Sequence, residues 1–186
     1  MVRHVAGFLG TTLALTLGIE VVATQVAQAV KLGDGTVAFV QPPDLIKATT
    51  TFNSVNVWGA TYYFTINVPK QAGEPLGKLT IVQREGGENI RYDLEDSRAF
   101  EGTRGDRGAK LQLGEVTRDR KTRTVEVNFN PPIPPGRTIT IGLRPVRNPM
   151  YSGVYLFGVT AFPAGEKSRG QFIGFGRLHF YSGGID

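Results

Sequence analysis

Short hydrophobic runs with a period of two dominate the pattern of this chain. In residues 138–143, isoleucine and leucine occupy the odd-numbered positions, whereas threonine and glycine occupy the even-numbered ones. This alternation is typical of a half-buried β-strand. Residues 154–159 are apolar on both faces, which indicates a central strand covered on both sides. Comparable runs predict further strands at residues 36–40, 62–68, 78–83, 89–94, 111–117, 122–129 and 172–181.

Proline and glycine separate these runs. Residues 131–136 hold four prolines before Gly136, which predicts a stiff, extended connection closed by a glycine turn. A docking peptide for an aromatic groove is the functional alternative for this stretch. Pro145 and Pro149 lack a backbone donor, so the chain breaks between strands there. Residues 93–110 form the longest polar segment, and we predict a mobile loop, the type of segment that often carries function.

The composition favours an all-β chain. The sequence contains 24 glycines and 11 prolines among 186 residues, and helix interiors tolerate neither residue well. No repeat, heptad or long linker divides the sequence. We therefore predict a single antiparallel β-sandwich-like domain of about eight or nine strands, with a closed barrel as the alternative.

The first 29 residues have the layout of a secretory signal peptide. A basic start is followed by an uncharged stretch and a closing Ala-Gln-Ala triplet. Small residues at the first and third positions of that triplet predict cleavage after Ala29, with residues 30–186 as the single β-sandwich domain. An uncleaved anchor is the alternative, but Glu20 interrupts a run that would need about 20 apolar residues to span a membrane. In both cases the rest of the chain is exported.

The sequence lacks the residues that several kinds of catalytic and metal sites require. The chain has no cysteine, which excludes disulfides, thiolate metal sites and cysteine nucleophiles. His179 is the single histidine beyond the leader, so no histidine cage for a metal is possible, and no G-x-S-x-G motif occurs. A Ser-His-Asp site around His179 is formally open, but a hydrogen-bonded histidine on a strand face is favoured. We predict no catalytic residue, metal ligand or cofactor.

The acidic residues of the polar segment are candidates for a calcium site, because Ca²⁺ needs six to eight oxygen ligands. Their spacing matches no EF-hand, and three arginines are interleaved with them, so a solvated, salt-bridged loop is favoured. A pair of carboxylates for glycoside hydrolysis is a further alternative. The glycine-rich residues 102–108 lack the G-K-[ST] ending of a phosphate loop. The carboxylates concerned are Asp93, Glu95, Asp96, Glu101 and Asp106, and the arginines are Arg98, Arg104 and Arg107.

A basic run supplies the candidate binding residues. The formal net charge is +5, and residues 118–123 concentrate positive charge between two predicted strands. A contact with a polyanion or an anionic lipid surface is the functional interpretation, and a solvated hairpin tip is the other. Nucleic acid is not expected as a partner of an exported chain. The candidate residues are Arg118, Arg120, Lys121 and Arg123.

Three aromatic residues are candidates for a platform on which a sugar could stack. Trp58, Tyr62 and Tyr63 lie close together in the sequence. Neighbouring residues of a strand point to opposite faces, so Tyr62 and Tyr63 cannot share one site. Core packing is therefore the favoured interpretation.

Several short motifs follow one another in order along the mature chain. They are Pro42-Pro43-x-Leu45, Tyr63-Phe64-Thr65-Ile66-x-Val68-Pro69, Ala72-Gly73-Glu74-Pro75-Leu76, Pro131-Pro132-x-Pro134-Pro135-Gly136, Thr138-x-Thr140-x-Gly142-Leu143-x-Pro145-Val146-x-Asn148-Pro149, Gly153-Val154-Tyr155, Pro163-x-Gly165 and Gly176-Arg177-x-His179-x-Tyr181. This ordered set resembles an exported cyanobacterial family catalogued as domain of unknown function 2808. The resemblance implies a periplasmic, thylakoid-lumenal or cell-surface location, and it implies no activity, ligand or catalytic residue.

Together these patterns predict a non-enzymatic binding or structural module of the envelope or the thylakoid lumen. Its expected partner is an envelope or thylakoid protein complex or an anionic surface. A small secreted hydrolase or sugar-active enzyme is the first alternative, and a carbohydrate or calcium binding module is the second. Carboxylates clustered in a pocket would indicate the enzyme, and exposed coplanar aromatics would indicate sugar binding. A flat apolar patch rimmed by arginine would indicate a protein partner.

Overall fold

The computed structural model describes residues 30, 31 and 33–183, which form strands and turns without a helix. The expected signal peptide, residues 1–29, lies outside the described residues. Within the described part of the chain, no helix is long and apolar enough to cross a membrane.

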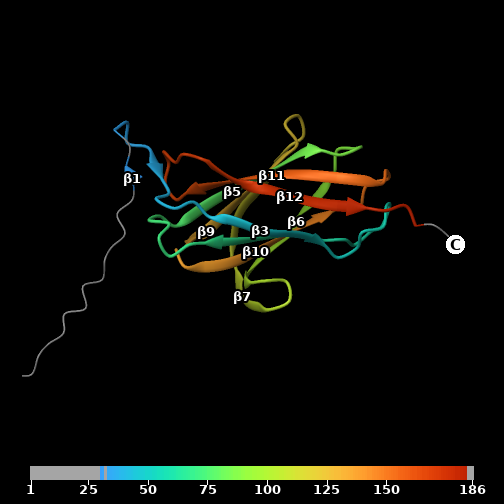
Figure 1. The fold of residues 1–186 in the computed structure, drawn as a ribbon, viewed down its shortest axis with the longest axis horizontal. Helices are drawn as coiled ribbons and strands as arrows, with labels where there is room; N and C mark the ends of the chain where they lie inside the picture. Colours follow the sequence, from blue (N-terminus) through green and yellow to red (C-terminus); the bar gives the residue numbers. More distant parts are fainter. Residues whose placement is uncertain (1–29, 32, 184–186) are drawn as a thin grey trace, which may run out of the picture.

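Two antiparallel sheets of five strands pack face to face, as Figure 1 shows. The first sheet has the order β3 (Asp44–Thr50), β4 (Tyr62–Val68), β10 (Arg137–Pro145), β6 (Tyr92–Gly102) and β7 (Arg107–Leu111). The second sheet has the order β12 (Gln171–Phe180), β11 (Gly153–Pro163), β5 (Leu76–Glu85), β9 (Thr124–Ile133) and β8 (Leu113–Asp119). A small ribbon joins β1 (Val30–Lys31) and β2 (Val37–Ala38). The predicted β-sandwich is therefore confirmed, and the two sheets hold ten strands.

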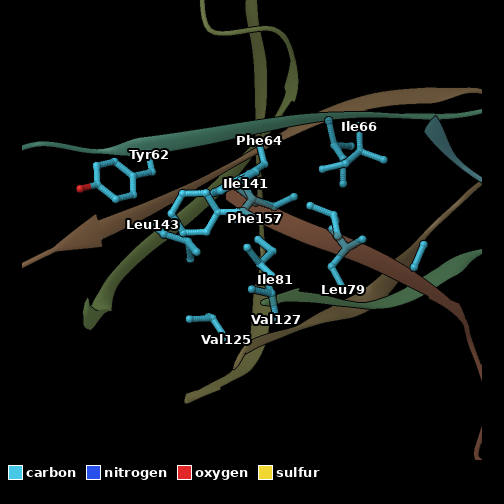
Figure 2. Packing of buried hydrophobic residues seen from close by; sticks show 14 of the residues in the cluster. Tyr62, Phe64, Ile66, Leu79, Ile81, Val125, Val127, Ile141, Leu143 and Phe157 are labelled. Atoms are coloured by element: carbon cyan, nitrogen blue, oxygen red, sulfur yellow. The ribbon is translucent and has the colours of Figure 1, made fainter. Parts of the chain in front are cut away.

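The core lies between the two sheets, and the alternation seen in the sequence places its residues there. On β4, Tyr62, Phe64 and Ile66 point inward and are fully buried. They meet side chains from the opposite sheet, and Phe64 packs edge-to-face on Phe157 with ring centroids 5.7 Å apart (Figure 2). Tyr63 points to the outer face of its sheet, so the two tyrosines lie on opposite sides of the strand as predicted.

The polar segment of residues 93–110 is not the mobile loop that its composition predicts. Most of it forms β6 and β7, with a short turn between them. The prediction is wrong because these strands lie at one side of the sheet, where much of their surface faces water and polar residues are tolerated on both faces. Residues 44–50, for which no strand was predicted, form the edge strand β3, whose residues are all exposed or half-buried.

The proline-rich stretch agrees with the extended conformation predicted for it. Residues 131–133 prolong β9, and Gly136 closes the turn into β10 with a φ of 81°. The backbone N–H of Gly136 donates to the carbonyl of Val68 at 2.8 Å. A residue with a side chain rarely adopts such a φ, so glycine suits this turn.

Each of the four edge strands carries one residue more than the inner strand with which it pairs. In β3 the extra residue is Ile46, because Leu45 and Lys47 pair with consecutive residues of β4. The same shift occurs in β12 at Ile173, between residues 107 and 110 of β7, and between residues 113 and 116 of β8. An extra residue of this kind is a β-bulge, which bends the strand and increases its twist.

Candidate functional site

The basic run lies between the two predicted strands: Arg118 and Asp119 end β8, and residues 120–123 form the turn into β9. The carboxylate of Asp119 accepts hydrogen bonds from the backbone N–H groups of Lys121 (2.8 Å) and Thr122 (3.4 Å). These bonds and the Thr122 side chain lower the pKa of Asp119. Arg123 has a φ of 56°, and its carbonyl accepts a hydrogen bond from the backbone of Gln83 at 3.0 Å.

The four candidate basic residues do not form one surface, because Arg118 turns back toward the fold. Its Nη2 atom donates to the side-chain oxygen of Asn89 and to the carbonyl of Ile90, both at 2.6 Å. Its guanidinium lies 5.9 Å from the ring centre of Tyr92, and partial burial lowers its pKa. Arg118 therefore braces the loop between β5 and β6. The exposed remainder, which we name the basic tip, consists of Arg120, Lys121 and Arg123.

The three aromatic residues that were named for sugar stacking lie in three different environments. Core packing is confirmed for Tyr62, which lies between the sheets. It is wrong for Tyr63, which is buried on the outer face of its sheet, and for Trp58, which is 67% exposed. Trp58 does not stand alone. Four further large apolar side chains are at least 50% exposed on neighbouring loops at the end of the sandwich from which the C-terminal tail leaves (Figure 1). We name this group the aromatic end; it consists of Phe52, Trp58, Met150, Tyr151 and Tyr181.

Backbone hydrogen bonds hold the segments of the aromatic end together. The segment between β3 and β4 is joined to the one between β10 and β11, since Asn56 donates to the carbonyl of Pro149 at 2.8 Å. The same segment is joined to the end of β12, since Tyr181 donates to the carbonyl of Asn53 at 2.8 Å. The exposed side chains therefore project from an ordered base rather than from free loops.

A buried asparagine fastens this base to the core. Asn148 is fully buried, and its side-chain amide donates to the carbonyls of Phe52 (2.9 Å) and Ser54 (2.8 Å). Its side-chain oxygen accepts a hydrogen bond from the hydroxyl of Tyr62 at 3.0 Å. Burial raises the pKa of Tyr62, and nearby Tyr92 adds to the effect. The sequence offered no signal for this role beyond the position of Asn148 before a proline.

The carboxylates of β6 pair with arginines of the neighbouring strand. Asp96 contacts Arg144 at 2.8 Å, and Glu101 contacts Arg137 at 3.5 Å. The prediction of a salt-bridged segment is thus confirmed for these two carboxylates, but their partners come from β10. Over residues 30, 31 and 33–183, no group of three or more histidine, aspartate and glutamate side chains is placed to hold a metal ion.

The three arginines that are interleaved with these carboxylates point elsewhere. Arg98 and Arg107 both donate to the hydroxyl oxygen of Tyr63, at 2.9 and 3.5 Å. Arg104 lies with its guanidinium 5.3 Å from the centre of the same ring. Sequence proximity suggested local ion pairs, whereas the hairpin of β6 and β7 brings these arginines to Tyr63 of β4, a strand far away in the chain. We name Arg98, Arg104 and Arg107 the arginine cluster.

His179 lies on a strand face, as predicted, at the exposed edge strand β12. Its ring is nearly parallel to that of Tyr181, at an interplanar angle of 25° and a centroid distance of 6.3 Å. The hydrogen bond expected for it is not found among the described residues.

The likeness to solved structures is distant. The collagen-binding domain of a Staphylococcus aureus adhesin matches 66% of this chain and 87% of its own, at 13% identity and a TM-score of 0.36. The collagen-binding subdomain of the Enterococcus faecalis surface protein ACE matches 71% of this chain and 92% of its own, at 8% identity and a TM-score of 0.36. The C-terminal domain of the Streptococcus agalactiae polypeptide BspA matches 82% of this chain and 48% of its own, at 14% identity and a TM-score of 0.40.

A comparison with curated protein sequences finds none that matches. The comparison with protein families gives a clear result. Residues 36–180 match a family described as protein of unknown function DUF2808. The match spans every strand of both five-stranded sheets and all the motifs noted above except the last residue, Tyr181. This chain therefore belongs to the DUF2808 family.

Proposed function

We propose that this chain is an exported, non-enzymatic binding module that docks onto a protein partner through the aromatic end. One observation carries the proposal: five large apolar side chains are exposed together on loops that a buried asparagine and backbone hydrogen bonds hold in place. Exposed apolar clusters mark interaction sites, and aromatic residues and methionine are enriched at protein interfaces. Ordered loops also lower the entropy lost on binding.

The charge around the aromatic end indicates the kind of partner. The loop between β5 and β6 links the aromatic end to the basic tip. The carboxylate of Glu88 accepts a hydrogen bond from the backbone of Met150 (3.1 Å), and Asn89 donates to the carbonyl of Arg120 (3.2 Å). Arg147 adds a further cation on the loop that carries Met150. The complementary surface is therefore an apolar protein patch bordered by acidic residues.

The location forms part of the proposal. The leader pattern of residues 1–29 and the ordered motifs support export, with the cyanobacterial periplasm, the thylakoid lumen or the cell surface as the destination. The leader would be removed after Ala29, leaving residues 30–186 as one domain. The partner would then be an envelope or thylakoid protein complex.

Site-specific photo-crosslinking in the cells that make the protein tests the docking surface. A benzoylphenylalanine replaces Trp58 or Tyr151 in the full-length chain, and Phe172 serves as the matched control because it is an exposed aromatic of β12. Adducts are identified by mass spectrometry after irradiation. We expect the same protein adduct from positions 58 and 151 and none from position 172.

Two results would overturn the proposal. One is that positions 58 and 151 give no protein adduct that position 172 lacks, or that position 172 alone gives a protein adduct. The other is a lipid adduct in place of a protein, which would make the aromatic end a membrane contact. The double variant Arg120→Ser/Lys121→Ser tests the basic tip separately, and we expect it to reduce the yield of the adduct.

A further inference from the structure

The hairpin of β6 and β7 bends onto the outer face of its sheet, on the side away from the core (Figure 1). The bend occurs at Gly102, which has a φ of 81° and whose carbonyl accepts a hydrogen bond from the Thr140 hydroxyl of β10 at 2.7 Å. The turn of residues 103–106 reaches the opposite edge of the sheet, where Arg104 donates to the carbonyl of Thr50 at 3.0 Å. The turn thereby forms one wall of an open groove on the outer face.

The arginine cluster surrounds a single ring within this site. The guanidinium carbons of Arg98, Arg104 and Arg107 lie 5.7, 5.3 and 5.7 Å from the ring centre of Tyr63. Gly142 of the intervening strand makes the approach possible. A Cβ atom there would come within 3.0 Å of the Tyr63 ring and within 3.3 Å of the Arg98 side chain. The topology therefore assembles three cations around one point.

No carboxylate forms an ion pair with these three arginines among the residues that the structure describes. The ion pairs found there involve Lys78, Arg137 and Arg144, and none involves the arginine cluster. All three arginines are exposed to solvent, so a ligand can reach them. Like charges held this close repel one another, and an anion that enters between them relieves the repulsion.

The site also holds hydrogen-bond donors that the fold leaves unused. The oxygen of the Tyr63 hydroxyl accepts from two arginines, so its own hydrogen is free, and no acceptor for it lies among the described residues. The hydroxyl hydrogen of Thr61 is likewise unused among the described residues, since its oxygen accepts a hydrogen bond from Arg98 at 2.9 Å. Next to the cluster, an open groove of about 370 Å³ runs between the turn and β3. It is lined by Ile46, Lys47, Thr49, Thr65, Thr103, Arg104 and Gly105.

We propose that this outer face binds an oxyanion, a carboxylate, sulfate or phosphate group, between Arg98, Arg104 and Arg107, and that the adjoining groove takes the molecule that carries it. Planar guanidinium groups present paired N–H donors that match oxyanions. Lys47, Thr49 and Thr103 supply polar groups along the groove. This site is separate from the aromatic end and goes beyond the docking function proposed above.

Titration calorimetry at low ionic strength tests the proposal with four probes: sodium sulfate, sodium phosphate, trigalacturonate and the neutral trisaccharide maltotriose. The test variant is Arg104→Gln/Arg107→Gln. The matched control is Arg120→Gln/Lys121→Gln, which removes the same charge from the basic tip. We expect at least one oxyanion probe to bind saturably. The test variant should weaken that binding by about tenfold or more, since hydrogen bonds to charged groups are lost, and the control should change it by no more than about twofold.

The probes distinguish the sources of the anion. Binding of trigalacturonate without binding of sulfate or phosphate would assign the site to an acidic saccharide, whereas binding of the inorganic ions shows that the anion alone suffices. Amide shifts at Thr103 and Gly105 in a two-dimensional NMR titration locate the ligand. Binding of maltotriose alone, no saturable oxyanion binding, or equal weakening by the control variant would overturn the proposal. Should the double variant fail to fold, Tyr63→Phe, which keeps the ring and removes the free donor, must still weaken binding.

Discussion

Replacement of Asn148 by alanine should release the loop that carries Phe52 and Trp58. The amide of Asn148 makes three hydrogen bonds from a fully buried position: two to loop carbonyls and one from the hydroxyl of Tyr62. Alanine can make none of them. The two carbonyls belong to exposed residues, Phe52 and Ser54, so water can reach the loop once it moves. The hydroxyl of Tyr62 remains buried and has no other partner among the described residues.

The expected cost follows from these environments. An ordinary hydrogen bond contributes about 1 kcal/mol, and a buried polar group left without a partner costs about 1–3 kcal/mol. Two solvated carbonyls and one stranded hydroxyl therefore predict a loss of about 3–5 kcal/mol for Asn148→Ala. Tyr62→Phe removes one of the bonds and should cost about 1–2 kcal/mol. The double variant should show a coupling of about 1 kcal/mol between the two sites.

Urea denaturation provides the measurement. Far-UV circular dichroism reports the sheets, and the anisotropy of Trp58, the single tryptophan of the chain, reports the loop. We expect Asn148→Ala to lower the urea midpoint and the Trp58 transition to precede the loss of the sheets, as local unfolding requires. Asn128→Ala is the control, because its amide makes one exposed hydrogen bond, to the carbonyl of Glu115 at 2.9 Å.

An unchanged midpoint for Asn148→Ala, or coincident transitions by the two probes, would refute this reasoning. Either result would mean that the backbone hydrogen bonds alone order the aromatic end. An Asn128→Ala variant that loses as much stability would likewise show that the effect does not depend on burial.

Three further predictions concern packing and pH. Gly176→Ala places a methyl group 2.8 Å from Ala48 and 3.0 Å from Phe64, and should cost about 1–3 kcal/mol in urea denaturation. Burial raises the pKa of Tyr62. Its contribution to stability is therefore complete below the free pKa of about 10 and is lost as the pH rises above that value. In Tyr62→Phe, the urea midpoint should fall less steeply at alkaline pH. Hydrogen bonds lower the pKa of Asp119, so its contribution is present above about pH 3.9 and is lost as the pH falls through the lower folded value. Asp119→Asn should reduce the loss of the urea midpoint at acid pH. An unchanged loss would contradict the stabilising role assigned to Asp119.

The sequence predicted the fold class because burial in a two-layer sheet repeats every second residue. Tyr62, Phe64 and Ile66 illustrate the point, since their period alone places them inside. The prediction failed for residues 93–110, where both faces of the strands carry polar side chains and the alternation disappears. The edge strands β8 and β12 kept enough alternation to be predicted, whereas β6 and β7 did not.

The candidate sites were harder to foresee because they depend on contacts between distant strands. The run at residues 118–123 was located correctly, but the inward turn of Arg118 depends on Asn89 and Ile90, which follow another strand. The contact between Arg98 and Tyr63 requires β10 to lie between their strands and to present a glycine at the crossing point. Strand order is a property of the folded sheet, so neighbouring charges in the chain gave the wrong partners.

The bulges in all four edge strands have a consequence for how copies of this protein behave together. A regular edge offers a row of free backbone donors and acceptors, and a second chain can continue the sheet from it. Here β3, β7, β8 and β12 each break that row with an extra residue. Pairing of sheet edges between copies of this protein is therefore disfavoured, which leaves contacts with other molecules to the loops and to the outer faces of the sheets.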